Sequence, residues 1–94
     1  MTVEILLDGR DIPDRKVLHD LLAEKFQLPD YYGRNLDALY DLLTAYPEPI
    51  RVTVVHTNQL RENLGRYANS FLQTLEDAAR SNGRIALSVF SENI

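Results

Sequence analysis

The sequence predicts a single α/β domain over residues 1–94, built on a three-stranded parallel sheet. Three short segments, 2–7, 50–55 and 84–90, are rich in branched apolar residues and have the length of strands. The segments between them are longer and carry apolar residues at helical spacing. Strands separated by helical connections of this length pair in parallel through right-handed crossovers.

Polar residues inside the strand segments predict two layers. Thr53 and Ser88 alternate with valine and leucine positions, so one face of the sheet is less apolar than the other. We therefore expect about four helices that cover mainly the other face.

The first helix is expected to follow the first strand closely. Asp14 is its candidate N-cap, and an apolar stripe continues to about Gln27. Leu28-Pro29 then interrupts the pattern, and Gly33 is expected to supply a positive φ in the loop before the second helix.

The second helix is expected over residues 35–46, with Asn35 as N-cap, until Pro47 and Pro49 prevent its continuation. After the second strand, Thr57 or Asn58 is expected to cap a short helix. Gly65 then breaks the pattern before a longer helix over residues 67–81.

Composition limits the class of function. Ninety-four residues, with 45% hydrophobic and 26% charged, suit one ordinary soluble domain. A net charge of −4 argues against direct binding of nucleic acid and favours a basic partner. The absence of cysteine excludes disulfides and thiolate chemistry. The N-terminal residues resemble neither a signal peptide nor a membrane span, so we expect a cytoplasmic location with no membrane contact.

The most distinctive stretch is residues 30–46, which holds four of the five tyrosines. At 3.6 residues per turn, four leucines fall on one stripe, which predicts a core-facing side. A second stripe carries two carboxylates one helical turn apart, and its members are Asp37, Tyr40, Asp41 and Thr44. Spacing alone is equally consistent with a solvated acidic helix face or with a contact surface.

No motif in the chain predicts an enzyme. Asp37 and Asp41 could in principle act as an acid–base pair or bind a hard metal ion. A convex helix face offers no cleft, however, and no histidine follows at ligand spacing. We expect His19 and His56 to be surface or partly packed residues, so no catalytic residue, metal site or cofactor is predicted.

Residues 28–41, LPDYYGRNLDALYD, closely resemble the segment LPxYYGxNLDALWD of the barstar family, intracellular inhibitors of the ribonuclease barnase. The match is ungapped, and the predicted order of elements resembles the barstar fold over the whole chain. The resemblance implies an immunity protein, monomeric when free. Helix 35–46 and loop 29–34 of such a protein would occlude the active site of a microbial ribonuclease.

The resemblance also implies roles for individual residues. Asp41 matches the family's central aspartate, expected to mimic an RNA phosphate, and Asp37 matches its companion. Tyr40 stands where the family has tryptophan, and Ala45 where it has glycine. Counted back from Gly83, the contacting glutamate of the last helix falls at Ala78. The residues implied to bind the partner are Tyr31, Tyr32, Asn35, Asp37, Tyr40, Asp41, Thr44, Ala45 and Tyr46.

Two classes of function remain open at this point. The first is the ribonuclease inhibitor implied by the resemblance. The second is a barstar-fold interaction or regulatory protein whose basic partner is not a ribonuclease. The central aspartates of the family's binding surface are retained here, whereas several peripheral contact positions differ. This pattern is what we expect if the partner is a ribonuclease other than barnase.

Overall fold

Three strands and four helices make up the described part of the chain, residues 2–93 of a computed structural model. The elements follow in the order β1 (Val3–Asp8), a 3-10 turn (Gly9–Asp11), α1 (Arg15–Lys25), α2 (Leu36–Thr44), β2 (Ile50–Val55), α3 (Thr57–Leu64), α4 (Arg66–Ser81) and β3 (Ile85–Val89). The predicted α/β class with a three-stranded parallel sheet is confirmed. Residues 1 and 94, the ends of the predicted domain, lie outside the described residues.

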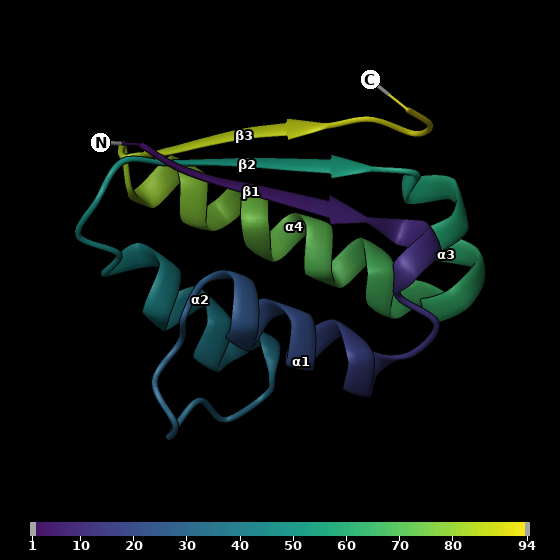
Figure 1. Cartoon of the computed structure of the whole chain (residues 1–94), viewed down its shortest axis with the longest axis horizontal. Coiled ribbons are helices and arrows are strands. Elements are labelled where there is room, and N and C mark those ends of the chain that lie inside the picture. The colour runs from purple at the N-terminus through teal and green to yellow at the C-terminus, as the bar shows by residue number, and fades with distance from the viewer. Residues whose placement is uncertain (1, 94) are drawn as a thin grey trace.

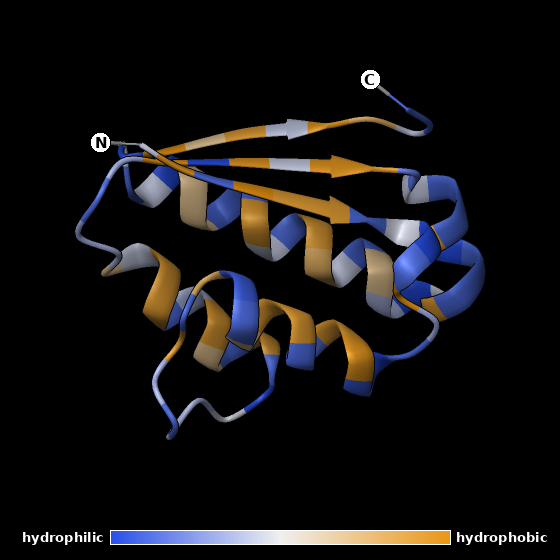
Figure 2. Ribbon diagram, viewed as in Figure 1, coloured by the Kyte–Doolittle hydropathy of each residue, from blue (hydrophilic) through white to orange (hydrophobic). Residues whose placement is uncertain are grey.

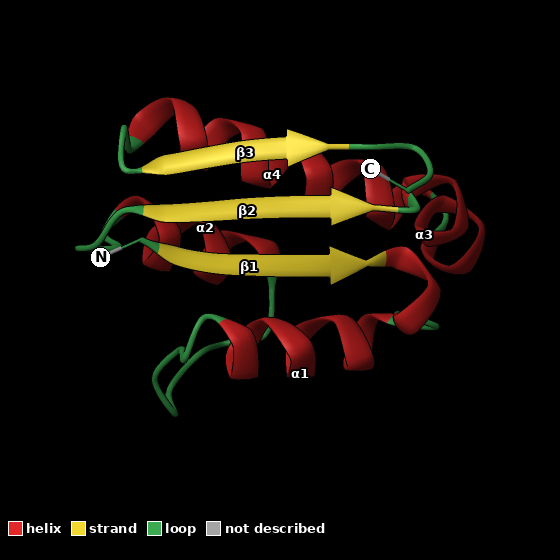
Figure 3. Ribbon diagram, turned by 45° about the horizontal axis from the view of Figure 1, so that its top comes forward, coloured by secondary structure: helices red, strands yellow, loops and turns green. Residues whose placement is uncertain are grey.

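The sheet has the order β1-β2-β3, and both pairs are parallel. Val3 pairs with Ile50, and Ile50 pairs in turn with Ile85, so the three strands start level with one another. Figure 3 shows the three arrows pointing the same way. Helices α1 and α2 connect β1 to β2, and α3 and α4 connect β2 to β3.

The helices lie on one side of the sheet, so the molecule has two layers (Figure 1). Ile5, Leu7, Val52 and Val54 point toward the helices and are buried. Figure 2 shows hydrophobic residues recurring along the strands and at helical spacing along α4. The other face is open in Figure 3, and Leu6 on it keeps 51% of its surface exposed. This confirms the two-layer prediction.

The predicted helix starts are confirmed where a local side chain provides the cap. Asp14 accepts a hydrogen bond from the Val17 backbone N–H at 2.9 Å and begins α1. The predicted cap of α3 is wrong, because His56 holds the N-cap position at φ 54° without a side-chain bond. The C-terminal tail accepts the first hydrogen bonds of the helix instead, since the amides of Thr57 and Asn58 donate to carbonyls of residues 90 and 91.

Gly33 was expected to supply a positive φ, and this is wrong: within the loop before α2 that conformation occurs at Gln27 and Arg34. Gly33 serves by lacking a side chain, because a Cβ there would lie 3.0 Å from Asn35 Nδ2. Helix α1 stops at Lys25, whereas the sequence predicted an end near Gln27. Gln27 adopts the left-handed conformation and ends the turn that follows the helix.

Candidate functional site

Helix α2 separates its apolar and acidic residues as the sequence predicts. Leu39 and Leu43 are buried in the core, whereas Asp37 and Asp41 are exposed. Within residues 2–93 neither carboxylate takes part in an ion pair. Asp37 lies in the first turn, where the helix dipole favours a negative charge. Asp41 lies a turn further along, beyond this effect, and its carboxylate faces solvent.

Asn35 joins the loop to the helix. Its Oδ1 accepts a hydrogen bond from the Ala38 backbone N–H at 2.8 Å, and its Nδ2 donates to the Gly33 carbonyl at 3.1 Å. The first bond caps α2 and the second closes the loop. The Asn35 side chain is exposed, but both of its polar atoms are engaged in fixing the backbone.

The two adjacent loop tyrosines point in opposite directions. Tyr31 is 81% exposed, whereas Tyr32 is only 7% exposed and belongs to the core. The family resemblance implies Tyr32 as a binding residue, and the structure places its ring in the core. Its hydroxyl bonds His19 Nδ1 at 2.6 Å, and the Tyr67 hydroxyl bonds His19 Nε2 at 2.7 Å. This chain of polar contacts ties the loop to α1 and α4.

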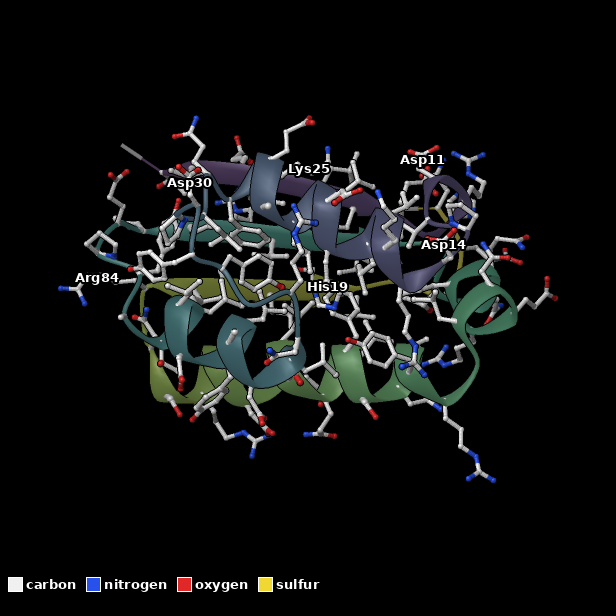
Figure 4. All side chains as sticks on the ribbon, turned by 90° about the horizontal axis from the view of Figure 1, so that it is seen from below. Asp11, Asp14, His19, Lys25, Asp30 and Arg84 are labelled. Carbon is white, nitrogen blue, oxygen red and sulfur yellow. The ribbon has the colours of Figure 1, made fainter. Side chains whose placement is uncertain are left out.

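His19 is more deeply packed than the sequence suggested, since it is 3% exposed (Figure 4). Burial lowers its pKa below the ordinary value, and the Arg34 cation adds to this while Asp20 opposes it. Burial also raises the pKa of Tyr32 to about 12. Burial raises the pKa of Tyr67 as well, so all three shifts favour a neutral imidazole between two protonated tyrosines at neutral pH.

The far end of α2 adjoins an apolar hollow. Thr44 donates its hydroxyl to the Asp41 carbonyl at 3.1 Å, and Ala45 is exposed at the C-cap. Tyr46 is half-buried with its ring edge-on to Phe26. A hollow of about 230 Å³ opens there, lined by Phe26, Gln27, Leu28, Pro29, Tyr31, Leu42, Ala45, Tyr46 and Pro47. The loop and the end of α2 thus line one hollow, with Tyr31 on the loop side and Tyr46 on the helix side.

Helix α4 lines the same side of the molecule with Asp77, Arg80 and Ser81, which the sequence analysis did not include among the binding residues. The Tyr40 hydroxyl lies 2.9 Å from Ser81 Oγ. A polar hollow of about 290 Å³ beside them is lined by Tyr40, Asp77, Arg80 and Ser81. Ala78, which the sequence placed at the family's glutamate position, is wholly buried, and Asp77 is the carboxylate that reaches this hollow.

The periodicity of α4 carried the missed signal. Its buried residues are Ala68, Phe71, Leu72, Leu75 and Ala78, which follow the spacing of a single apolar face. A residue in that series cannot contact a partner. Asp77 and Ser81 lie outside this stripe, together with the other exposed residues of α4. Periodicity therefore excludes Ala78 as a contact, and the structure shows that Asp77 and Ser81 line the hollow.

Within residues 2–93 no three histidine, aspartate or glutamate side chains are grouped to hold a metal ion. His56 is half-buried at the end of β2, away from α2. None of the helices in the described part of the chain is both long and apolar enough to cross a bilayer.

Comparison with known proteins identifies the family of this chain. The sequence model of the family described as Barstar (barnase inhibitor) matches residues 2–92. The chain belongs to the barstar family. One barstar relative is the protein named Putative ribonuclease inhibitor YrdF of Bacillus subtilis (strain 168), 42% identical over 76 residues. That alignment covers 80% of this chain and 84% of the relative.

Proposed function

We propose that this barstar-family chain is a non-enzymatic inhibitor of a microbial ribonuclease. Helix α2 and loop 29–34 would occlude the ribonuclease active site, with Asp41 standing in for an RNA phosphate. Family membership and the name of the Bacillus relative support the inhibitor class. The observation that carries the mechanism is the pair of exposed, unpaired carboxylates, Asp37 and Asp41, on a capped helix.

Electrostatics explains why such a helix suits a ribonuclease. An active site that binds RNA phosphates must present clustered positive charge, and carboxylates on a rigid helix can occupy the positions of those phosphates. Long-range attraction raises the association rate, and close charge-assisted hydrogen bonds slow dissociation. Because Asp37 and Asp41 form no internal ion pair within residues 2–93, no existing contact must break before they bind.

Aromatic residues would supply the apolar part of the interface. Tyr31 is the most exposed large hydrophobic side chain of the described residues and lies beside the hollow at the end of α2. Exposed tyrosines next to charge are typical of binding surfaces, since a rigid ring buries much area at a low entropic cost. The remainder of this surface would be formed by Tyr40, Thr44, Ala45 and Tyr46. Tyr32 would contribute indirectly, by holding the loop to the core.

In this proposal the protein acts as a monomer in the cytoplasm of the cell that makes the ribonuclease. The ribonuclease would be a toxin and this chain its immunity protein. The inhibitor would contact the protein partner only, with no RNA, membrane or cofactor involved.

The test is inhibition of RNA cleavage by a panel of purified secreted microbial ribonucleases that includes barnase. We expect stoichiometric inhibition of at least one member, and we expect Asp41→Ala to weaken it by roughly 30-fold or more. Glu62→Ala is the matched control, because it removes one exposed carboxylate from α3. Asp41→Asn should weaken inhibition without lowering stability, since it relieves repulsion from Asp37.

Failure to inhibit any ribonuclease on the panel would contradict the proposal. It would favour the alternative of a basic partner of another kind. Equal inhibition by the parent chain and Asp41→Ala would retain the inhibitor class but refute phosphate mimicry by Asp41.

A further inference from the structure

The polar hollow between α2 and α4 contains a positive charge beside an otherwise acidic surface. Its lining is Tyr40 from α2 and Asp77, Arg80 and Ser81 from α4. Asp37 and Asp41, on the same helix as Tyr40, would meet a basic active site. A cation at the rim of such a surface opposes attraction to a basic partner unless it meets an acidic group there.

Arg80 is available for such a contact. Its Nη2 lies 3.4 Å from Asp77 Oδ1, and the two side chains are 72% and 45% exposed. An exposed pair at this distance is only weakly stabilising, so the guanidinium can turn to another acceptor at little cost. Asp77 would not lose its only partner, because Gln73 Nε2 donates to the same Oδ1 at 3.0 Å.

Two hydroxyl groups stand beside the guanidinium in the hollow. The Tyr40 and Ser81 hydroxyls are 2.9 Å apart and link α2 to α4 across the hollow. Arg80 belongs to the last turn of α4, one residue before Ser81 at the helix end. The hollow therefore offers a planar donor group beside two hydroxyls that are hydrogen-bonded to each other.

The geometry points to Arg80 as a specificity-determining residue that receives a side-chain carboxylate, Asp or Glu, of the partner ribonuclease in this hollow. The inference rests on the proposed function and adds the chemistry of one partner residue to it. A guanidinium binds a carboxylate through two parallel N–H···O bonds, which gives orientation as well as attraction. A ribonuclease with a lysine or arginine at that place would be rejected by like charge, so Arg80 would select among basic partners.

Arg66 provides a closely matched control for the test. It is an exposed arginine at the start of the same helix, roughly 21 Å from Arg80 along the helix axis at 1.5 Å per residue. Changing either arginine to alanine or glutamate alters the net charge of the inhibitor equally. Both changes should raise long-range attraction to a basic ribonuclease by a similar amount.

The experiment measures inhibition constants of Arg80→Ala, Arg80→Glu, Arg66→Ala and Arg66→Glu against whichever ribonuclease of the panel the parent chain inhibits. Melting temperatures of all four variants check that the fold is retained. We expect the Arg66 variants to inhibit as well as the parent or slightly better. The Arg80 variants should inhibit more weakly, by about tenfold for Arg80→Glu.

A second arm identifies the receiving group. Each exposed carboxylate of the ribonuclease near its active site is changed to alanine in turn, and one such change should abolish the difference between the parent and Arg80→Ala. Indistinguishable Arg80 and Arg66 variants would overturn the inference. Tighter binding by Arg80→Ala than by Arg66→Ala would also overturn it, because the partner would then present a cation to Asp77.

Asp41→Ala, measured beside these variants, separates the two proposals. If no ribonuclease is inhibited, the proposed function fails and this inference fails with it. If Asp41→Ala loses inhibition while the Arg80 variants behave like the Arg66 variants, only the role of Arg80 is refuted.

Discussion

Asn82 holds the end of the candidate binding helix, and its removal should be costly. It is buried at the end of α4, where its Nδ2 donates to the Leu43 carbonyl at 3.0 Å and to the Tyr46 carbonyl at 3.1 Å. Its Oδ1 accepts from the Arg84 backbone N–H at 3.0 Å. One side chain therefore serves three backbone groups around the C-terminal end of α2.

Asn82→Ala should lower the free energy of unfolding by about 2–4 kcal/mol. Leu43 contributes least, because its carbonyl also accepts from the Tyr46 backbone N–H at 3.1 Å and stays satisfied. The Tyr46 carbonyl and the Arg84 amide lose the bonds to Asn82, and each such loss costs about 1–2 kcal/mol in a partly buried position.

Urea unfolding monitored by circular dichroism measures the change, with an unaltered m-value as the sign that the denatured state is the same. Asn69→Ala is the control, since Asn69 lies exposed on α4 and accepts a single hydrogen bond from Arg61. It should cost less than about 1 kcal/mol. A loss for Asn82→Ala as small as the control's would refute the view that Asn82 holds the end of α2.

Two further predictions concern stability. Because burial lowers the pKa of His19 from its ordinary 6.5, the unfolded chain binds more protons than the folded chain below that pH. Stability should therefore fall as pH drops from about 6.5 through the lowered pKa, and His19→Gln should remove this part of the dependence in thermal melts across pH 5–8. Gly9→Ala should cost about 2–4 kcal/mol in urea unfolding, because its Cβ would lie 2.2 Å from the His56 carbonyl oxygen. Gly83→Ala is the control for Gly9, since nothing lies within 4 Å of a Cβ there, and an equal loss in both variants would contradict the steric explanation.

Local signals made much of the fold predictable from the sequence. The second strand was predicted as residues 50–55 and is β2, Ile50–Val55. The caps Asp14 and Asn35 were predicted and are confirmed, because each bonds an amide three residues ahead in its own helix. Each of these features depends on residues that are neighbours in the chain.

Features that depend on distant residues could not be predicted in the same way. The buried Tyr32 is hydrogen-bonded to His19, thirteen positions away in the chain, and His19 is bonded in turn to Tyr67. The start of α3 depends on carbonyls of the C-terminal tail, so no capping residue at the helix itself reveals it. The count from Gly83 that matches the family's contacting glutamate to Ala78 leads to a buried position, because such a count ignores which face of the helix packs in the core.

The distribution of polar contacts around α2 gives the strongest physical argument for a binding helix. Asn35 fixes its start, the Tyr40–Ser81 pair its middle and Asn82 its end, and all three act beside or beneath the exposed acidic face. If the residues of α2 served only to stabilise the helix, we would expect cations one turn away from its aspartates. Here the backbone is held rigidly and Asp37 and Asp41 have no partner among the described residues. Rigid support under unpaired charge lowers the entropy lost on binding, so the arrangement favours a preorganised anionic surface over a merely solvated helix.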